Sequence, residues 1–301
     1  MRMIEPITVT PGMLTSSTVP ENDHPAWAVG TTYAQGARVT FDRRIWESVQ
    51  NGNTGNNPGT DATGGWWVRV EAVNRWRAFD NALTPLTAQA ADITYVLTLT
   101  QRVDSVAMFG LIGSSARITI KDTGGATRYD KTFQLASGRV VKDWWDWFFA
   151  PFALVPSLIA EKLPGYLGWT LTITIAGTGT RAVGEILIGN TVVLGKSLTG
   201  TEAGFRDFSV KEKDQWGNWQ VVERGYSSTV DYRFALPDDD VDRVKRTIAR
   251  NRARLCVFST GTKSAALGTT ILGFINQDGL TIPISGPTCF ATLSVEGVTE
   301  E

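Results

Sequence analysis

Histidine is nearly absent from this chain, since His24 is the single imidazole among 301 residues. A histidine-based catalytic triad and a multi-histidine metal site both need imidazoles that the sequence does not have. The two cysteines, Cys256 and Cys289, lie too far apart for a CxxC redox or zinc motif and make no disulfide framework. We expect both to be buried thiols, and we expect no catalytic residue, no metal ligand and no cofactor.

An excess of one charge and long apolar runs are lacking too. The 29 Lys and Arg balance 30 Asp and Glu, so the net charge of -1 provides no overall field to attract nucleic acid or an acidic membrane surface. No run of about 18 apolar residues is present, and the amino end, MRMIEPITVT, lacks the apolar core of a secretion signal. The sequence therefore predicts synthesis and folding in a cytosol, no membrane insertion and no nucleic-acid partner.

Tryptophan and glycine are abundant instead, with 11 Trp and 30 Gly, and composition changes along the chain suggest domain boundaries. The expected divisions are residues 1–22, 23–73, 74–195 and 196–301. The first division interleaves threonines with prolines and predicts an extended arm.

Residues 23–73 predict a small β module. Strands are expected at 37–41 and 45–49, joined as a hairpin through 42–44, and residues 51–65 predict a long irregular loop. The unusual aromatic set of this segment is Trp27, Tyr33, Trp46, Trp66 and Trp67. Flat rings stack on the C–H faces of sugars, and neighbouring Asn or Asp side chains can bind hydroxyl groups. So small a module also needs some of these rings for its core.

Residues 74–195 alternate between apolar and hydroxyl-bearing residues with a period of two, which predicts half-buried strands. The predicted strands lie at 93–100, 116–123, 171–178 and 186–190. A turn at 122–125 joins two of them, so a β-sandwich is favoured over a βαβ fold.

Residues 196–301 predict an α+β domain with one main helix, which falls within 237–254. Its run Asp238–Asp240 offers N-cap oxygens and favourable charge. A calcium loop would need alternating ligands, a central Gly and a distal Glu, which do not follow here. The apolar face of the helix carries Val241, Val244 and Ile248. Strands are predicted at 208–213, 219–236, 255–259, 270–276 and 290–298.

The aromatic run DWWDWFFAPF at 143–152 holds the one candidate pair of catalytic carboxylates. Asp143 and Asp146 would serve as acid and base of a glycan hydrolase, which needs two carboxylates across a sugar. The competing interpretation is a loop that packs large aromatics under the sandwich or against a neighbouring subunit. Since phosphate-binding, dinucleotide-binding and nucleophile-elbow glycine motifs are also missing, we expect no enzymatic activity and keep the hydrolase as an alternative.

The string AWAVGTTYAQGARVTFDRRIWESVQNGNTGNNPG…WWVRV resembles the chitin-binding family 5/12 carbohydrate-binding module. The positions that carry the resemblance are Trp27, Tyr33, Gly36, Val39, Trp46, Asn57, Pro58 and Trp67. The family's usual Gly-Asp after the Tyr is Gly36-Ala37 here. The resemblance implies a polysaccharide-binding β module, a type that also occurs as a structural part of phage tails.

The rest of the chain resembles a family of tailed-bacteriophage tail or baseplate-associated virion proteins, over nearly the whole length and in the same order. The matching strings are NRWRAFDN at 74–81, RVDSVAMFGL at 102–111, DWWDWFFAPF at 143–152, VGEILIGN at 183–190, FSVKEKDQWGNWQVVERGYSS at 208–228 and TCFATLSVEGV at 288–298. This resemblance implies a carbohydrate-binding-like module at 23–73, a galactose-binding-like β-sandwich at 74–195 and a tail-type domain at 196–301.

The expected function is thus that of a non-enzymatic structural protein of a phage tail or baseplate, assembled in the cytoplasm of the bacterial host and carried on the virion. Its expected partners are other tail or baseplate proteins, further copies of itself and host-surface polysaccharide. Trp46 and Trp66 are the candidates for sugar stacking, with Tyr33 third, whereas Trp27 and Trp67 are assigned to the module core. In an alternative, the module is an adaptor whose aromatic rings contact another tail protein.

Overall fold

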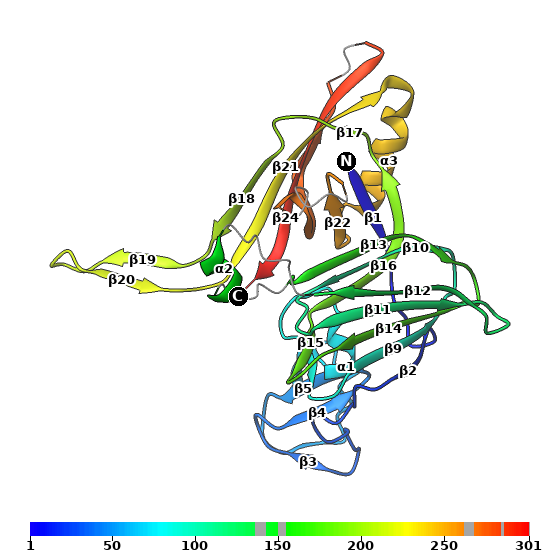
Figure 1. The fold of residues 1–301 in the computed structure, drawn as a ribbon. Coiled ribbons are helices and arrows are strands. Elements are labelled where there is room, and N and C mark those ends of the chain that lie inside the picture. Colours follow the sequence, from blue (N-terminus) through cyan, green and yellow to red (C-terminus); the bar gives the residue numbers. More distant parts are fainter. Residues whose placement is uncertain (136–142, 150–154, 262–267, 284–285, 301) are drawn as a thin grey trace.

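The computed structural model describes residues 1–135, 143–149, 155–261, 268–283 and 286–300. Over these residues the chain is mainly β, with a two-layered sandwich and one main helix towards the carboxyl end (Figure 1). The predicted fold class is confirmed. The small module lies at one end of the sandwich, and the strands of the carboxy-terminal unit extend from its other end (Figure 1).

The small module contains a three-stranded antiparallel sheet of order β4-β5-β7 and a two-stranded ribbon of β3 and β6. The bounds are β3 Thr32–Tyr33, β4 Arg38–Phe41, β5 Arg44–Ser48, β6 Asn53–Thr54 and β7 Trp67–Ala72. The predicted β4–β5 hairpin is confirmed. It turns at Asp42 and Arg43, whose φ angles of 46° and 65° are those of a two-residue turn that matches the twist of the strands.

One layer of the sandwich is a five-stranded antiparallel sheet of order β12-β11-β14-β9-β2. The bounds are β2 Leu14–Ser17, β9 Ile93–Thr98, β11 Ser115–Lys121, β12 Thr127–Gln134 and β14 Thr170–Ala176. Fully buried residues stand opposite one another across this sheet, with Ile118 beside Ile173 and Ile173 beside Tyr95. The period of two therefore turns the apolar side chains inwards and the threonines outwards.

The other layer belongs to a ten-stranded sheet of order β13-β10-β16-β1-β22-β23-β24-β21-β17, in which β18 also pairs with β21. The bounds are β1 Arg2–Ile7, β10 Val103–Phe109, β13 Ser157–Gly165, β16 Glu185–Val193, β17 Lys196–Ser197, β18 Glu202–Asp207, β21 Tyr226–Pro237, β22 Cys256–Ser259, β23 Ile271–Thr281 and β24 Thr288–Glu300. The sandwich core receives Met108, Ile186 and Ile188 from this sheet.

Strand β1 lies inside the ten-stranded sheet. It pairs antiparallel with β16, where Pro6 stands opposite Gly189, and with β22, where Met3 stands opposite Phe258. Residues 1–22 are thus extended, as predicted, but their strands are paired, since β2 also pairs with β9. The sheet continues without a break across the expected boundary at 195/196, because β1 connects strands from both sides of it.

Short elements join the small module to the sandwich. They are helix α1 Asn74–Arg77 and the paired strands β8 Thr87–Gln89 and β15 Arg181–Val183. The guanidinium of Arg77 lies 3.3 Å from the Glu71 carboxylate and 3.8 Å from that of Asp23. The Asn74 backbone N–H also donates to Asp23 at 3.0 Å. These contacts hold both ends of the small module, residues 23–73, against α1.

The main helix, α3 Val241–Asn251, is confirmed, and Val244 and Ile248 are buried on its inner face. The predicted capping by aspartate side chains was wrong. Residues Asp238–Asp240 form a 3-10 turn, and Asp240 has helical backbone angles, which are not those of a side-chain cap. Its carboxylate instead accepts a hydrogen bond from Arg243 Nε at 2.8 Å. Both cysteines are free and buried, as expected.

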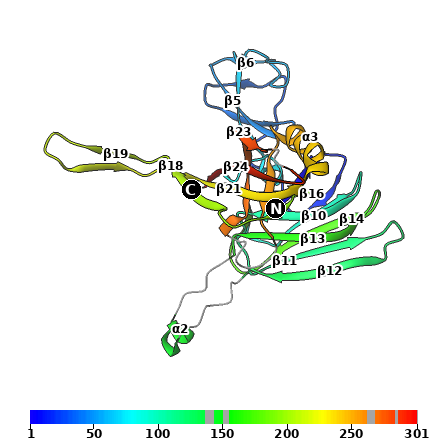
Figure 2. The same ribbon diagram turned by 90° about the horizontal axis from the view of Figure 1, so that it is seen from above.

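Two segments project separately from the body (Figure 2). One is the hairpin of β19 Val210–Lys213 and β20 Trp219–Val222, and the other is helix α2 Trp144–Phe149. Of the two placements expected for the aromatic run, packing under the sandwich was wrong for its described rings, and contact with a neighbouring subunit stays a prediction. Trp144, Trp145 and Phe148 are exposed, because the short helix stands away from both layers (Figure 2).

Candidate functional site

The loop before β7 holds Trp66 and Trp67 in place through one carboxylate. Asp61 accepts hydrogen bonds from the backbone N–H groups of Trp66 at 2.7 Å and Trp67 at 2.8 Å, and from the Thr63 hydroxyl at 3.2 Å. Burial alone raises the pKa of Asp61, but these hydrogen bonds outweigh it and lower the pKa below its ordinary value. The long Gly/Asn-rich loop is therefore ordered around Asp61.

Replacing Asp61 by alanine is expected to lower the free energy of unfolding by about 1–2 kcal/mol, because two N–H groups lose a charged acceptor. Urea denaturation followed by tryptophan fluorescence measures the change. Asp239→Ala, which removes an exposed carboxylate far from the module, serves as the control. Equal stability of the two variants would contradict a carboxylate-ordered loop.

Trp67 belongs to the core of the module, in agreement with its assignment. Its ring is 1% exposed, its Nε1 donates to the Asn56 carbonyl at 2.8 Å, and the Tyr33 ring meets it edge-on at 5.2 Å. The Tyr33 hydroxyl accepts the Ala28 N–H at 2.8 Å. Trp27 is half-buried rather than fully buried. Tyr33 therefore has a structural role beside any contact that it makes with a ligand.

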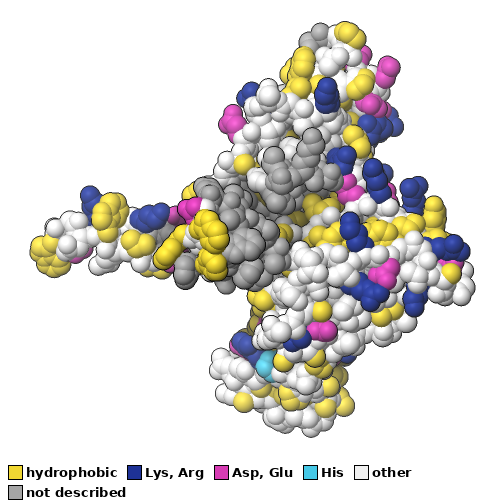
Figure 3. All heavy atoms as spheres, viewed as in Figure 1, with side chains coloured by type: hydrophobic (Ala, Val, Ile, Leu, Met, Phe, Trp, Pro, Cys, Tyr) yellow, Lys and Arg dark blue, Asp and Glu magenta, His cyan; other side chains and the backbone are white. Residues whose placement is uncertain are grey.

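Trp46 and Trp66 are half-buried, so each keeps part of its ring accessible. Trp46 stands in β5 opposite Val39, and its Nε1 donates to the Phe41 carbonyl at 3.2 Å. The Trp66 carbonyl accepts the Val49 N–H at 2.9 Å. Among the described residues no ring contact joins Trp46, Trp66 and Tyr33 to one another. All three belong to the small module, whose surface shows scattered hydrophobic side chains (Figure 3).

Most amide side chains near these rings bind the module itself. The Asn53 side chain is buried and donates to Ser48 Oγ at 3.0 Å, and Asn56 donates to Asn53 at 3.0 Å. Asn57 accepts the Gly59 N–H at 2.8 Å. The sequence pattern suggested such groups as partners for sugar hydroxyls, but the structure uses these three to order the loop.

An interacting pair of carboxylates, half-buried Asp80 and buried Glu185, was missed by the sequence analysis. Glu185 is 4% exposed, and its Oε2 accepts the Asn81 N–H at 3.0 Å. Burial raises its pKa well above the ordinary value, and the charge of Asp80 adds to the rise. Burial also raises the pKa of Asp80 to about 6. The available signal was a lone carboxylate in the apolar string VGEILIG.

A cavity of about 300 Å³ adjoins Glu185 at the joint between the sandwich and the carboxy-terminal unit. Phe79 and Phe274 contribute to its lining, as does Arg254, whose guanidinium donates to the Pro6 carbonyl at 2.7 Å. The side chains of Glu185 and Arg254 are hydrogen-bonded to the chain's own backbone, at Asn81 and Pro6. This arrangement fits a structural joint.

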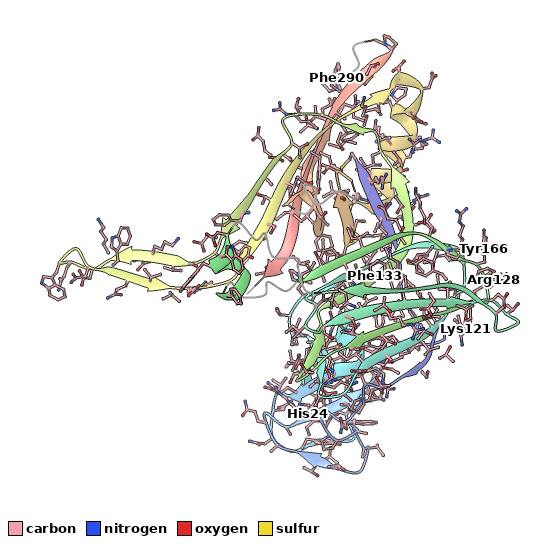
Figure 4. All side chains as sticks on the ribbon, viewed as in Figure 1. His24, Lys121, Arg128, Phe133, Tyr166 and Phe290 are labelled. Atoms are coloured by element: carbon pink, nitrogen blue, oxygen red, sulfur yellow. The ribbon has the colours of Figure 1, made fainter. Side chains whose placement is uncertain are left out.

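The remaining candidates lie on two parts of the chain, at helix α2 and on the small module. Asp143 is exposed at the start of α2, and the side chain of Asp146 lies outside the described residues. His24 lies on the small module (Figure 4). Within the described part of the chain, no three His, Cys, Asp or Glu side chains are grouped so as to hold a metal ion. Nor does that part contain a helix with the length and hydropathy of a membrane span.

No protein-family model matches the chain, and no curated protein matches it. Among solved structures, the chain is similar to the F5/8 type C domain of a Bacteroides fragilis protein. The similarity covers 44% of this chain and 85% of that one, with 13% sequence identity and a TM-score of 0.28. A similarity at this level carries no argument about ligand or activity, and the description of the fold rests on the strands themselves.

Proposed function

We propose that this protein is a non-enzymatic structural component of a bacteriophage tail or baseplate, whose small module contacts glycan on the host cell. The observation that carries the proposal is that three aromatic rings of one small module, Trp46, Trp66 and Tyr33, are each partly accessible. The colinear resemblance to tail-associated virion proteins supports a location in the phage tail or baseplate. The virion is then the site of action, and the other expected partners are tail or baseplate proteins.

The hydrogen bonds around Trp46 and Trp66 favour stacking of these rings on a sugar over a loose contact with it. The Trp46 Nε1 bond to Phe41 fixes one indole, and the Asp61 loop fixes the backbone on either side of the Trp66–Trp67 bond. A preorganised ring loses little conformational freedom when a ligand binds, so more of the stacking free energy appears as affinity. The same rigidity lets the module be carried on a particle without rearrangement.

The test is a binding titration with chitin oligosaccharides and with polysaccharide isolated from the host surface. Trp46→Ala and Trp66→Ala are each expected to weaken binding by about 1–3 kcal/mol, the usual scale for a lost aromatic anchor. Phe290→Ala, which removes an exposed ring at the far end of the carboxy-terminal unit, is the matched control and should bind as the wild type does (Figure 4). Unchanged binding by both module variants would refute the proposed sugar contacts.

One observation favours a second candidate, in which the module is an adaptor. Because Asn53, Asn56 and Asn57 are engaged internally, the rings are accompanied by few free polar groups that would bind sugar hydroxyls. Cryo-electron microscopy of the intact particle separates the two functions. Trp46 and Trp66 uncovered on an outward-pointing module support host contact, whereas the same rings buried against another tail protein support the adaptor.

A further inference from the structure

The β19–β20 hairpin extends into solvent and is paired only within itself. Its register runs from Val210 opposite Val222 to Lys213 opposite Trp219. An isolated two-stranded hairpin is marginally stable in water, yet this one carries Trp216, 77% exposed, and Trp219, 63% exposed. Figure 3 shows hydrophobic side chains along the hairpin and at its tip. A further surface is therefore needed to cover it.

The root of the same hairpin contains an open groove of about 560 Å³. Phe205 of β18 and Tyr226 of β21 line it, with their rings edge-on at 6.1 Å, and Val221 of β20 lies beside them. Phe205 is 72% exposed. The chain thus presents indole rings at the tip of the hairpin and an aromatic groove at its root.

The charges of tip and root are complementary. Lys213, next to the tip, places its Nζ 4.7 Å from the centre of the Trp219 ring. Glu223 lines the root groove and is exposed. Among the described residues neither Lys213 nor Glu223 forms an ion pair, whereas the root lysine, Lys211, is bound to Asp207 at 2.5 Å. Glu212 beside Lys213 and Arg224 beside Glu223 form no ion pair in the described part of the chain either, so tip and root each carry a cation and a carboxylate that can pair with those of a second copy.

We propose that two copies of this chain pair through their β19–β20 hairpins, antiparallel about a two-fold axis. The tip of each hairpin lies in the root groove of the other. Trp216 of one copy packs on the Phe205–Tyr226 ring pair of the second copy, and Lys213 faces Glu223. Each contact occurs twice, as the symmetry of an isologous interface requires. This pairing depends on the hairpin alone and stands apart from the proposed glycan contact.

The hairpin tips offer the area of a small interface. With about 200 Å² per ring, the exposed fractions of Trp216 and Trp219 present roughly 280 Å² of aromatic surface per copy. Two tips, together with the equal area of the root grooves that they cover, then bury roughly 1,100 Å² in total. This lies at the low end of the range for specific interfaces, so we expect a reversible dimer.

The first experiment is sedimentation velocity on the full chain over a range of concentrations. The wild type is expected to form a dimer, and Trp216→Ser is expected to weaken it at least about 100-fold, because a central aromatic anchor is lost twice. Phe290→Ser is the matched control, since that ring is 56% exposed and lies at the far end of the carboxy-terminal unit (Figure 4). Circular dichroism checks that each variant is folded.

Charge reversal identifies the partners. Lys213→Glu alone and Glu223→Lys alone each place like charges together and are expected to weaken the dimer about tenfold or more. An equal mixture of the two variants restores both contacts and is expected to dimerise like the wild type. A monomeric wild type at about 100 μM overturns the proposal. The proposal is also overturned by an assembly larger than a dimer, by a dimer that Trp216→Ser does not weaken, or by a mixture of the two charge variants that does not dimerise.

Discussion

Replacing Gly189 by alanine is expected to lower the free energy of unfolding by about 3 kcal/mol. Gly189 of β16 stands opposite Pro6 of β1, and a Cβ at this position would overlap the backbone carbonyl of Glu5. Because the obstructing atom belongs to the backbone of a central strand, no side-chain rotation relieves the clash, and the two strands must move apart. Urea or thermal denaturation measures the loss.

The matched control for this variant is Gly30→Ala. A Cβ at Gly30 meets nothing within 4 Å, so the substitution is expected to leave stability nearly unchanged. Hydrogen exchange adds a local measurement, since the amides of β1 and β16 should lose protection in Gly189→Ala before those of β11 and β14 do. Wild-type stability of Gly189→Ala would show that β1 does not pair with β16 in this register.

Replacing Glu185 by glutamine is expected to raise the free energy of unfolding at pH 8, because an amide replaces a buried carboxyl group that ionises more readily in the unfolded state. Burial and the charge of Asp80 raise the pKa of Glu185 in the folded protein, so the folded state binds more protons than the unfolded state. This contribution to stability is complete below the ordinary pKa and is lost as the pH rises through the raised value. Asp80, with its pKa raised to about 6, acts in the same direction.

The measurement is a series of urea denaturations between about pH 5 and pH 9. The wild type should lose stability as the pH rises, and Glu185→Gln should lose less, because its amide oxygen still accepts the Asn81 N–H but cannot ionise. Asp239→Asn, a change of an exposed carboxylate, should follow the wild type at each pH. A Glu185→Gln protein less stable than the wild type at pH 8 would mean that the ionised carboxylate is required.

Local pattern was enough to predict much of the fold. The alternation of apolar residues and threonines located β9, β11 and β14, because strands with one buried face have a period of two. The β4–β5 hairpin and helix α3 were predicted for similar reasons, since each depends on residues close together in sequence. The burial of Trp67 also followed from the need of a small module for a core.

Long-range pairing was the part that the sequence did not reveal. The string around β1 was interpreted as an extended arm because a proline such as Pro6 is unusual in a central strand, and the strands that pair with β1 lie far along the chain. The burial of Glu185 depends on elements that meet only in the folded protein. The hydrogen bonds that Asn53 and Asn56 form within the module likewise depend on the path of the loop.

The position of β1 also affects the order in which the protein forms. During synthesis β1 leaves the ribosome about 250 residues before β22, the strand on its other side. At about 5–20 residues per second, this strand waits for roughly 10–50 s with its backbone groups unpaired on at least one edge. Because sheet pairings between distant segments form slowly, the carboxy-terminal unit is expected to close last. Newly made chains would then be most open to aggregation or to chaperone binding through β1 and its neighbour β16.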